Sequence, residues 1–149
     1  MTSSHPLSAV RRTSMANTDL SQLSLCLVGA ACLVASGAIH LHLWNQYYRH
    51  ITTGHMNDLF LVQWILCFVG AAAVLSLRNL LAVGAGAALL AGTFVGYLLA
   101  RYHAGGLFGF ALPNNFSSSD ATWAMVVEIA GTVILAAAAL RFVRRRSSS

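Results

Sequence analysis

Charged residues are scarce in this chain, and lysine is missing from it altogether. Of its 149 residues only 9% are charged, while 57% are hydrophobic and the mean hydropathy is +0.67. In a soluble domain about a quarter of the residues are usually charged, so this composition excludes an ordinary soluble protein. A lipid bilayer is the expected solvent. The chain has room for several membrane-spanning helices but for no large domain outside the membrane.

Sequence motifs for catalysis are also missing. Cys26, Cys32 and Cys67 lie in apolar segments and form no C-x-x-C pair, which argues against a membrane thiol oxidoreductase. The sequence contains no nucleophile triad pattern, no phosphate-binding loop and no nucleic-acid-binding motif. The nine basic residues, all arginines, flank apolar segments, so anionic lipid is the expected partner and nucleic acid is not. These absences favour a protein that is not an enzyme.

The chain does contain four apolar runs, each long enough to cross about 30 Å of hydrocarbon as a helix. The expected fold is therefore all-α, a bundle of four transmembrane helices with antiparallel, up-down topology. Residues 1–21 are expected to form a disordered tail, residues 22–143 the membrane domain and residues 144–149 a basic tail. The predicted helices span about residues 23–44, 59–77, 80–100 and 121–143, and only Arg78 and Asn79 separate the second from the third.

The arginines indicate which way the bundle faces. The N-terminal tail, the turn at Arg78 and the C-terminal segment carry two, one and four of them, whereas the other two connections carry one each. Because positive charge is enriched in cytoplasmic loops, both termini are predicted to be cytoplasmic. An alanine-rich chain without lysine is typical of a GC-rich bacterial genome, so the expected location is a bacterial inner membrane. The arginine-rich C-terminus is expected to bind anionic lipid.

Small residues recur at every fourth position of the third apolar run. They are Gly84, Ala88, Gly92 and Gly96. Such a stripe allows another backbone to approach closely, and we interpret it as helix packing within the bundle, with a homodimer face as the alternative. Gly37 and Gly131 are the expected counterparts on other helices. Thr93 adjoins the stripe and can hydrogen-bond across to another helix or back to its own.

Each predicted helix presents one hydrogen-bonding side chain roughly 6 to 8 Å inside the membrane boundary that lies opposite the termini, at a rise of about 1.5 Å per residue. The four members of this polar layer are His40, Gln63, Tyr97 and Glu128. Polar groups that face hydrocarbon are costly, so these side chains are expected to face one another inside the bundle. Glu128 is the only acidic residue in any predicted span and is expected to pair with His40. The layer is either a structural hydrogen-bond network or a site for a ligand, a proton or electrons.

Further polar residues lie at the outer ends of the predicted helices, where His42, Asp58 and Arg101 are candidate site residues. His40 and His42 are two positions apart and point about 200° from each other on a regular helix. They therefore cannot both bind the same metal ion there. No metal and no resident cofactor is predicted, and haem or a metal ion is the minor alternative. Haem would need a second axial ligand from another subunit or from a methionine such as Met125.

Several segments together resemble a family of small four-helix integral membrane proteins that are common in actinobacteria. The resemblance covers about residues 25–140, and it implies the same fold and membrane location but no particular activity. The segments that carry it are residues 38–44 (AIHLHLW), 59–63 (LFLVQ), 92–99 (GTFVGYLL) and 106–110 (GLFGF), together with Tyr48, Trp123 and Glu128.

The sequence leaves three functions open. The missing motifs and the small-residue stripe favour a non-enzymatic accessory or interaction component, which acts with a membrane protein partner or with a second copy of the chain. The polar layer favours, as an alternative, a redox, quinone or proton-linked protein that uses His40 and Glu128. A subunit of an oligomeric small-molecule transporter is the second alternative, with Glu128 coupling an ion to transport.

Overall fold

A computed structural model of the chain describes residues 7–50, 55–112 and 118–147, with side chains from Leu20 onward. The described part is all-helical, and its four long helices are each long and apolar enough to cross a membrane. They are α1 (Leu7–Leu43), which continues as the π-helix η1 (Trp44–Tyr48), α2 (Met56–Leu77), α3 (Leu80–Tyr102) and α4 (Ser119–Ser147).

Helical structure extends beyond the apolar runs near both ends of the chain. α1 begins at Leu7, so residues 7–21, which the sequence predicts to be a disordered tail, are helical. α4 likewise continues to Ser147, into the predicted basic tail. Once a helix is nucleated, each further residue adds a hydrogen bond at little cost, and neither extension contains proline or glycine. Residues 1–6 and 148–149 of the two predicted tails lie outside the described residues.

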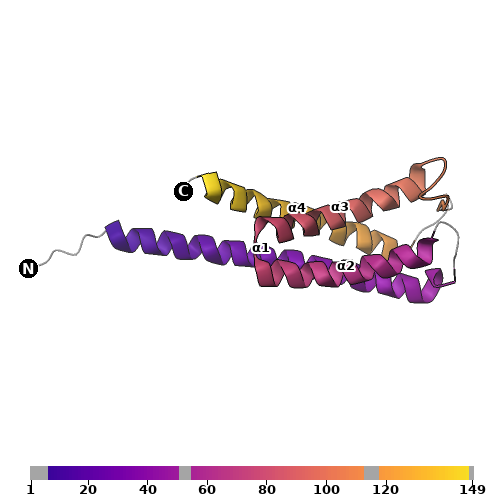
Figure 1. Ribbon diagram of the computed structural model, residues 1–149, viewed down its shortest axis with the longest axis horizontal. Helices are drawn as coiled ribbons and strands as arrows, with labels where there is room; N and C mark the ends of the chain where they lie inside the picture. Colours follow the sequence, from indigo (N-terminus) through magenta and orange to yellow (C-terminus); the bar gives the residue numbers. More distant parts are fainter. Residues whose placement is uncertain (1–6, 51–54, 113–117, 148–149) are drawn as a thin grey trace, which may run out of the picture.

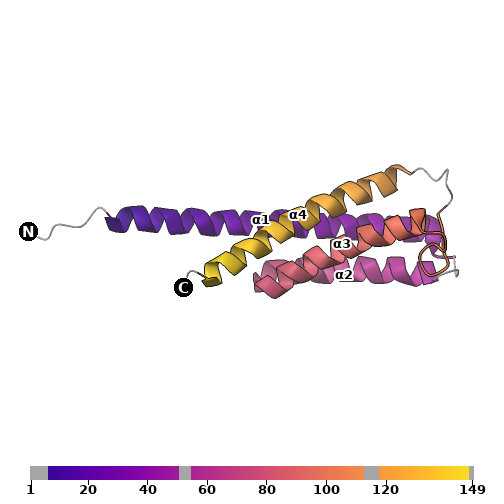
Figure 2. The ribbon, with the colours of Figure 1, turned by 90° about the horizontal axis from the view of Figure 1, so that it is seen from above.

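The helices lie side by side in a bundle with two distinct ends (Figure 1). The turn between α2 and α3 lies toward the same end as the beginning of α1 and the end of α4, and we call this the turn end. The two longer connections lie at the other end, which we call the loop end. α1 packs along α2 and α4, whereas α3 packs mainly against α4 and less extensively against α2. Figures 1 and 2 both show α3 diverging from α2 toward the loop end.

The turn between α2 and α3 consists of Arg78 and Asn79. Arg78 follows the last residue of α2 in a left-handed conformation (φ 45°, ψ 45°), and its Nε donates a hydrogen bond to the carbonyl oxygen of Leu75 at 2.9 Å. Asn79 caps α3, because its Oδ1 accepts a hydrogen bond from the backbone N–H of Ala82 at 2.9 Å. The two polar residues between the apolar runs therefore reverse the chain by themselves.

The close helix contacts do not lie where the stripe in α3 predicts them. A Cβ added at Gly84 or Gly92 would meet nothing within 4 Å. The glycines at which an added Cβ would meet a neighbouring helix most closely are Gly29, Gly37, Gly86 and Gly131. Gly37 faces α2, and Gly131 faces Leu90 of α3 and Cys32 of α1. A spacing of four places small residues on one face of a helix, but it does not determine whether a neighbour covers that face.

Candidate functional site

The four side chains of the predicted polar layer line one cavity toward the loop end of the bundle. His40 comes from α1, Gln63 from α2, Tyr97 from α3 and Glu128 from α4. The cavity has a volume of about 360 Å³. Most of the remaining wall consists of leucine, methionine, phenylalanine, alanine and glycine residues. The side chains that share one predicted depth thus surround a single, mainly apolar space.

Glu128 and His40 are both buried in the cavity wall. Their exposed fractions are 2% and 8%. His40 Nε2 lies 3.8 Å from Glu128 Oε1, and the hydroxyl of Ser36 donates a hydrogen bond to the same carboxyl oxygen at 3.3 Å. A separation of 3.8 Å is longer than a hydrogen bond. The predicted pair therefore stands side by side, close enough to interact electrostatically but without a direct hydrogen bond.

The backbone determines which ring nitrogen of His40 carries a hydrogen. Nδ1 lies 2.9 Å from the carbonyl oxygen of Ser36, and a carbonyl can only accept, so Nδ1 is the donor. Nε2, which is the nitrogen nearer to Glu128, can then accept or release a second proton. The carboxyl group of Glu128 is a second group at this place that can hold or release a proton. The pair can therefore bind an oxygen-bearing group and exchange one proton at that place.

A second polar group lies on the walls that α2 and α3 form. Gln63 donates through Nε2 to the hydroxyl oxygen of Thr93 and to Cys67 Sγ, the latter at 3.3 Å. The Thr93 hydroxyl in turn donates to the carbonyl oxygen of Leu89 at 2.8 Å, so it bonds both across to another helix and back to its own, the two options that the sequence leaves open. Tyr97 lies one turn further along α3 and also lines the cavity. The polar layer is thus divided into an α1/α4 group and an α2/α3 group.

The π-helix η1 helps to cover the cavity at the loop end. The backbone N–H of Arg49 donates to the carbonyl oxygen of Trp44 at 2.9 Å, which makes a turn one residue longer than in an α-helix. Tyr48 is consequently buried, although the three residues before it are exposed. Its ring stacks on Phe60, with ring centroids 4.2 Å apart, and meets Phe110 edge-on at 6.0 Å. These aromatic rings form a cover over the polar layer.

The connection after α3 completes the cover. Gly106 and Gly109 have φ angles of 65° and 82°, which allow the chain to fold back on itself. The backbone groups of Leu107 and Phe110 form two hydrogen bonds with each other, at 2.8 and 2.9 Å, and both residues line the cavity. The N–H of Leu112 then bonds to the carbonyl oxygen at position 100 at 2.8 Å and holds the connection against the end of α3.

The cavity reaches the side of the bundle along α3. Ala88 and Gly92 belong to its wall and are also exposed. Gly96 lines it beside Leu107, whereas Gly84, the fourth residue of the predicted stripe, is outside the lining. On the same helix Val95 is 50% exposed, so the surrounding surface is apolar. Ala88 and Gly92 therefore border a lateral opening toward the membrane rather than a neighbouring helix.

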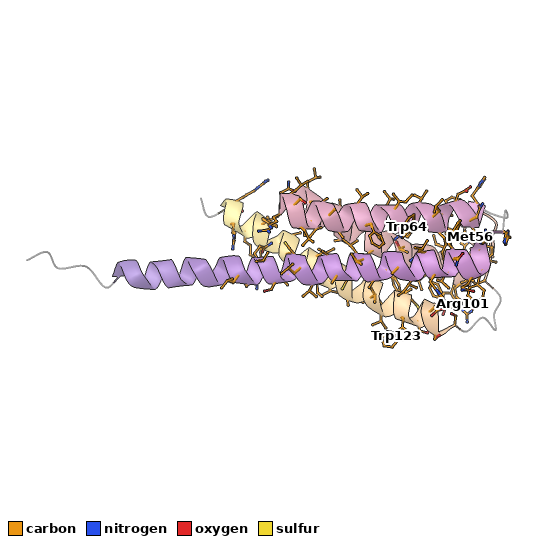
Figure 3. The ribbon with its side chains drawn as sticks, turned by 90° about the horizontal axis from the view of Figure 1, so that it is seen from below. Met56, Trp64, Arg101 and Trp123 are labelled. Carbon is orange, nitrogen blue, oxygen red and sulfur yellow. The ribbon has the colours of Figure 1, made fainter. Side chains whose placement is uncertain are left out.

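The candidate residues of the outer face lie outside the cavity lining. His42 Nε2 lies 3.9 Å from Asp120 Oδ2, and His55 Nδ1 lies 3.6 Å from Asp58 Oδ2. Arg101 lies at the loop end, as does Met56, while Trp123 projects away from the bundle (Figure 3). Within the described ranges, no group of three or more His, Cys, Asp or Glu side chains is placed to hold a metal ion. His42 and His55 thus each lie beside one carboxylate at the surface.

Ser36, Tyr48 and Phe60 contribute to the site, although the sequence analysis did not select them as site residues. Ser36 precedes His40 by four positions and Phe60 precedes Gln63 by three, so both lie on the same helix faces as predicted site residues. That spacing could have identified them. Tyr48 gave no such signal, because its burial depends on a π-helical turn that apolar periodicity does not reveal.

Comparison with known proteins provides no relative from which a function could be transferred. No family model, no curated protein and no solved structure matches the chain. The resemblance to small actinobacterial membrane proteins therefore stays a prediction, and function has to be inferred from the cavity itself.

Proposed function

We propose that this chain is a multi-pass membrane protein that binds a small lipophilic molecule in the cavity, with the molecule's polar group held beside His40 and Glu128. The observation that carries the proposal is a mainly apolar cavity with an imidazole and a carboxyl group 3.8 Å apart in its wall. Ligand cavities usually measure about 300 to 1,000 Å³ and combine apolar walls with a few polar groups that fix the ligand's orientation. The cavity of about 360 Å³ lies at the small end of that range.

A purely structural role for the polar layer fits this geometry less well. Hydrogen bonds that only join helices are expected between packed side chains, whereas these groups border open space. His40 and Glu128 receive no direct hydrogen bond from each other, so pairing offsets only part of the free energy that their burial requires. An oxygen atom of a ligand beside them can form a hydrogen bond with Nε2 or with the carboxyl group.

Ligand binding in this cavity is coupled to a proton. Because Nδ1 of His40 is committed to the carbonyl oxygen of Ser36, a ligand contacts a proton that is carried by Nε2 or by the carboxyl group of Glu128. This supports the quinone or proton-linked alternative over the transporter alternative. The protein remains non-enzymatic in our proposal, since the sequence contains no catalytic motif that would convert the ligand.

Native mass spectrometry of the protein purified in a mild detergent tests the proposal. We expect one lipophilic molecule to remain bound per wild-type chain. Ala124 is 7% exposed and lines the cavity, so Ala124→Leu fills part of the ligand space and is expected to remove the bound molecule while the bundle stays folded. Ala130→Leu is the control, because residue 130 is an exposed position of the same helix. Equal occupancy in both variants, or an empty wild-type chain, contradicts the proposal.

We also propose that the turn end faces the cytoplasm of a bacterial cell and the loop end faces outward. Support comes from the arginines, since the segments at the turn end carry two, one and four of them and the loop-end connections one each. A fluorescent protein fused to the C-terminus is expected to fluoresce, and alkaline phosphatase at the same place to be inactive, because the phosphatase becomes active only outside the cytoplasm. Fusions after residue 112 are expected to give the reverse pattern. Active phosphatase at the C-terminus contradicts this orientation.

A further inference from the structure

The two polar groups of the cavity lie on opposing walls. Because α1 packs along α2 and α4, and α3 packs against α4 and α2, the helices form a ring in the order α1, α2, α3, α4. The pair His40 and Glu128 belongs to the α1/α4 side of this ring, and Gln63 with Thr93 belongs to the α2/α3 side. A molecule between them meets hydrogen-bonding groups at both of its ends. This arrangement favours a compact head group with oxygen atoms on opposite sides.

The charge and shape of the wall restrict the head group further. Among the described residues that line the cavity there is no arginine, and the chain has no lysine, so a phosphate or sulfate head would lack a permanent cation to bind. Phe60 stacks on Tyr48 and lies with its ring centroid 5.2 Å from that of His40. Tyr48 and Phe60 both line the cavity, so the edges of their rings can contact a planar ring. The preferred head group is therefore uncharged and planar.

The lateral opening determines where the rest of the molecule lies. The loop end is covered by Tyr48, Leu107 and Phe110, so an elongated occupant does not extend in that direction. At Ala88 and Gly92, by contrast, the wall is exposed and consists of a methyl group and a hydrogen atom. A hydrocarbon chain attached to the head group leaves the cavity there and continues among the lipid chains.

We propose that the occupant is a membrane lipid of the quinone class, whose ring lies between the two polar groups and whose apolar chain leaves the bundle past Ala88 and Gly92. This inference rests on the proposed function and adds the class of ligand and the path of its chain. One ring oxygen accepts a hydrogen bond from the His40 and Glu128 pair. The opposite oxygen faces Gln63 and accepts from the Nε2 hydrogen that otherwise points to Cys67 Sγ. Small residues are needed at positions 88 and 92 because a larger side chain at either position would narrow the opening.

The test compares two probes and two matched variants in lipid nanodiscs. The probes are a benzoquinone with a decyl chain and the same ring with a methyl group in place of the chain, and binding is followed as a saturable adduct by native mass spectrometry. Gly92→Leu is expected to lower the affinity for the decyl compound by at least about tenfold, equivalent to losing the burial of roughly two methylene groups, and to leave the affinity for the methyl compound unchanged. Gly84→Leu is expected to behave as wild type with both probes, because Gly84 also faces open space but lies outside the cavity lining.

The remaining outcomes separate this inference from the proposed function. An equal loss of both probes in Gly92→Leu, or no loss of either, overturns the chain path. Decanoic acid that binds wild-type protein as tightly as the decyl benzoquinone overturns the quinone class. If neither quinone binds but purified protein still carries another lipophilic molecule that Ala124→Leu removes, the inference fails and the proposed function stands. Unfolding of Gly92→Leu is excluded beforehand by requiring the same melting temperature as Gly84→Leu.

Discussion

Replacing Glu128 by glutamine is expected to weaken ligand binding by at least about tenfold while the bundle stays folded. In the wild-type protein the Ser36 hydroxyl donates a hydrogen bond to Oε1 of Glu128 at 3.3 Å. The glutamine amide has the same shape as the carboxyl group, and its oxygen accepts this hydrogen bond as well. Its amide N–H is a weaker donor than a protonated carboxyl group, and it cannot release or take up a proton beside His40 Nε2. Hydrogen bonds to charged groups contribute about 1.5 to 3 kcal/mol, and each 1.4 kcal/mol is about tenfold in affinity. Titration of the decyl benzoquinone into nanodiscs, read by native mass spectrometry, measures the effect.

The pH dependence of binding provides an independent measurement on the same pair. A quinone oxygen can only accept hydrogen bonds, so the bound form keeps a proton on His40 Nε2 or on the Glu128 carboxyl group. By linkage, wild-type affinity falls as the pH rises through the range in which the free pair loses that proton. The double variant His40→Gln, Glu128→Gln is expected to bind weakly and with no pH dependence across the neutral range. Wild-type binding that is equally tight at every pH in that range contradicts the role of the proton.

Gln22 provides the matched control for these variants. It is 6% exposed, donates from Nε2 to the carbonyl oxygen of Ala138 at 3.2 Å, and lies outside the cavity lining. Gln22→Leu therefore removes a buried hydrogen bond between helices without touching the cavity, and it is expected to keep the ligand affinity within about twofold of wild type. If Glu128→Gln likewise changes only the melting temperature, the polar layer is structural and the proposed function is wrong.

The helical fold could be predicted because lipid allows few alternatives. A backbone in hydrocarbon has to satisfy its own hydrogen bonds, so each long apolar run becomes a helix. The ends of the helices were less predictable, since water tolerates a polar segment as helix or as tail. Residues 7–21 are polar, which predicts a tail, yet they continue α1. Hydropathy reports which solvent surrounds a segment, and outside the membrane it does not determine the backbone conformation.

The sequence predicts the depth of the site residues along their helices, but it does not predict how each helix is rotated about its axis. Counting residues from the ends of the apolar runs placed His40, Gln63, Tyr97 and Glu128 at one level, and all four line the cavity. Their division into two groups depends on the rotation of each helix about its axis, which the apolar runs do not specify. Gln63 thus bonds to Thr93 and Cys67. The same limit applies to the stripe in α3, whose spacing predicts packing, although Ala88 and Gly92 line the cavity and are exposed.

Replacing Gly131 by alanine is expected to destabilise the bundle by about 1 to 3 kcal/mol, the usual range for overpacking a close contact. A Cβ at this position would lie 2.5 Å from Leu90 Cδ1 and 2.7 Å from Cys32 Cβ. The Leu90 methyl group can rotate away, but the Cys32 Cβ is fixed to the backbone of α1, so α1 and α4 have to move apart. The free energy of unfolding, measured in mixed detergent micelles with increasing denaturing detergent, is expected to fall accordingly.

Gly84→Ala is the matched control, because the same methyl group at that position meets no atom within 4 Å. It is expected to be neutral or to stabilise α3 by up to about 1 kcal/mol through the higher helix propensity of alanine. Cys32→Gly removes the fixed Cβ opposite Gly131, so the double variant Gly131→Ala, Cys32→Gly is expected to recover part of the loss. The three variants together test whether α1 and α4 approach at this point. Equal stability of Gly131→Ala and Gly84→Ala would show that the two helices do not meet there, and the wall that carries His40 and Glu128 would then have to be placed differently.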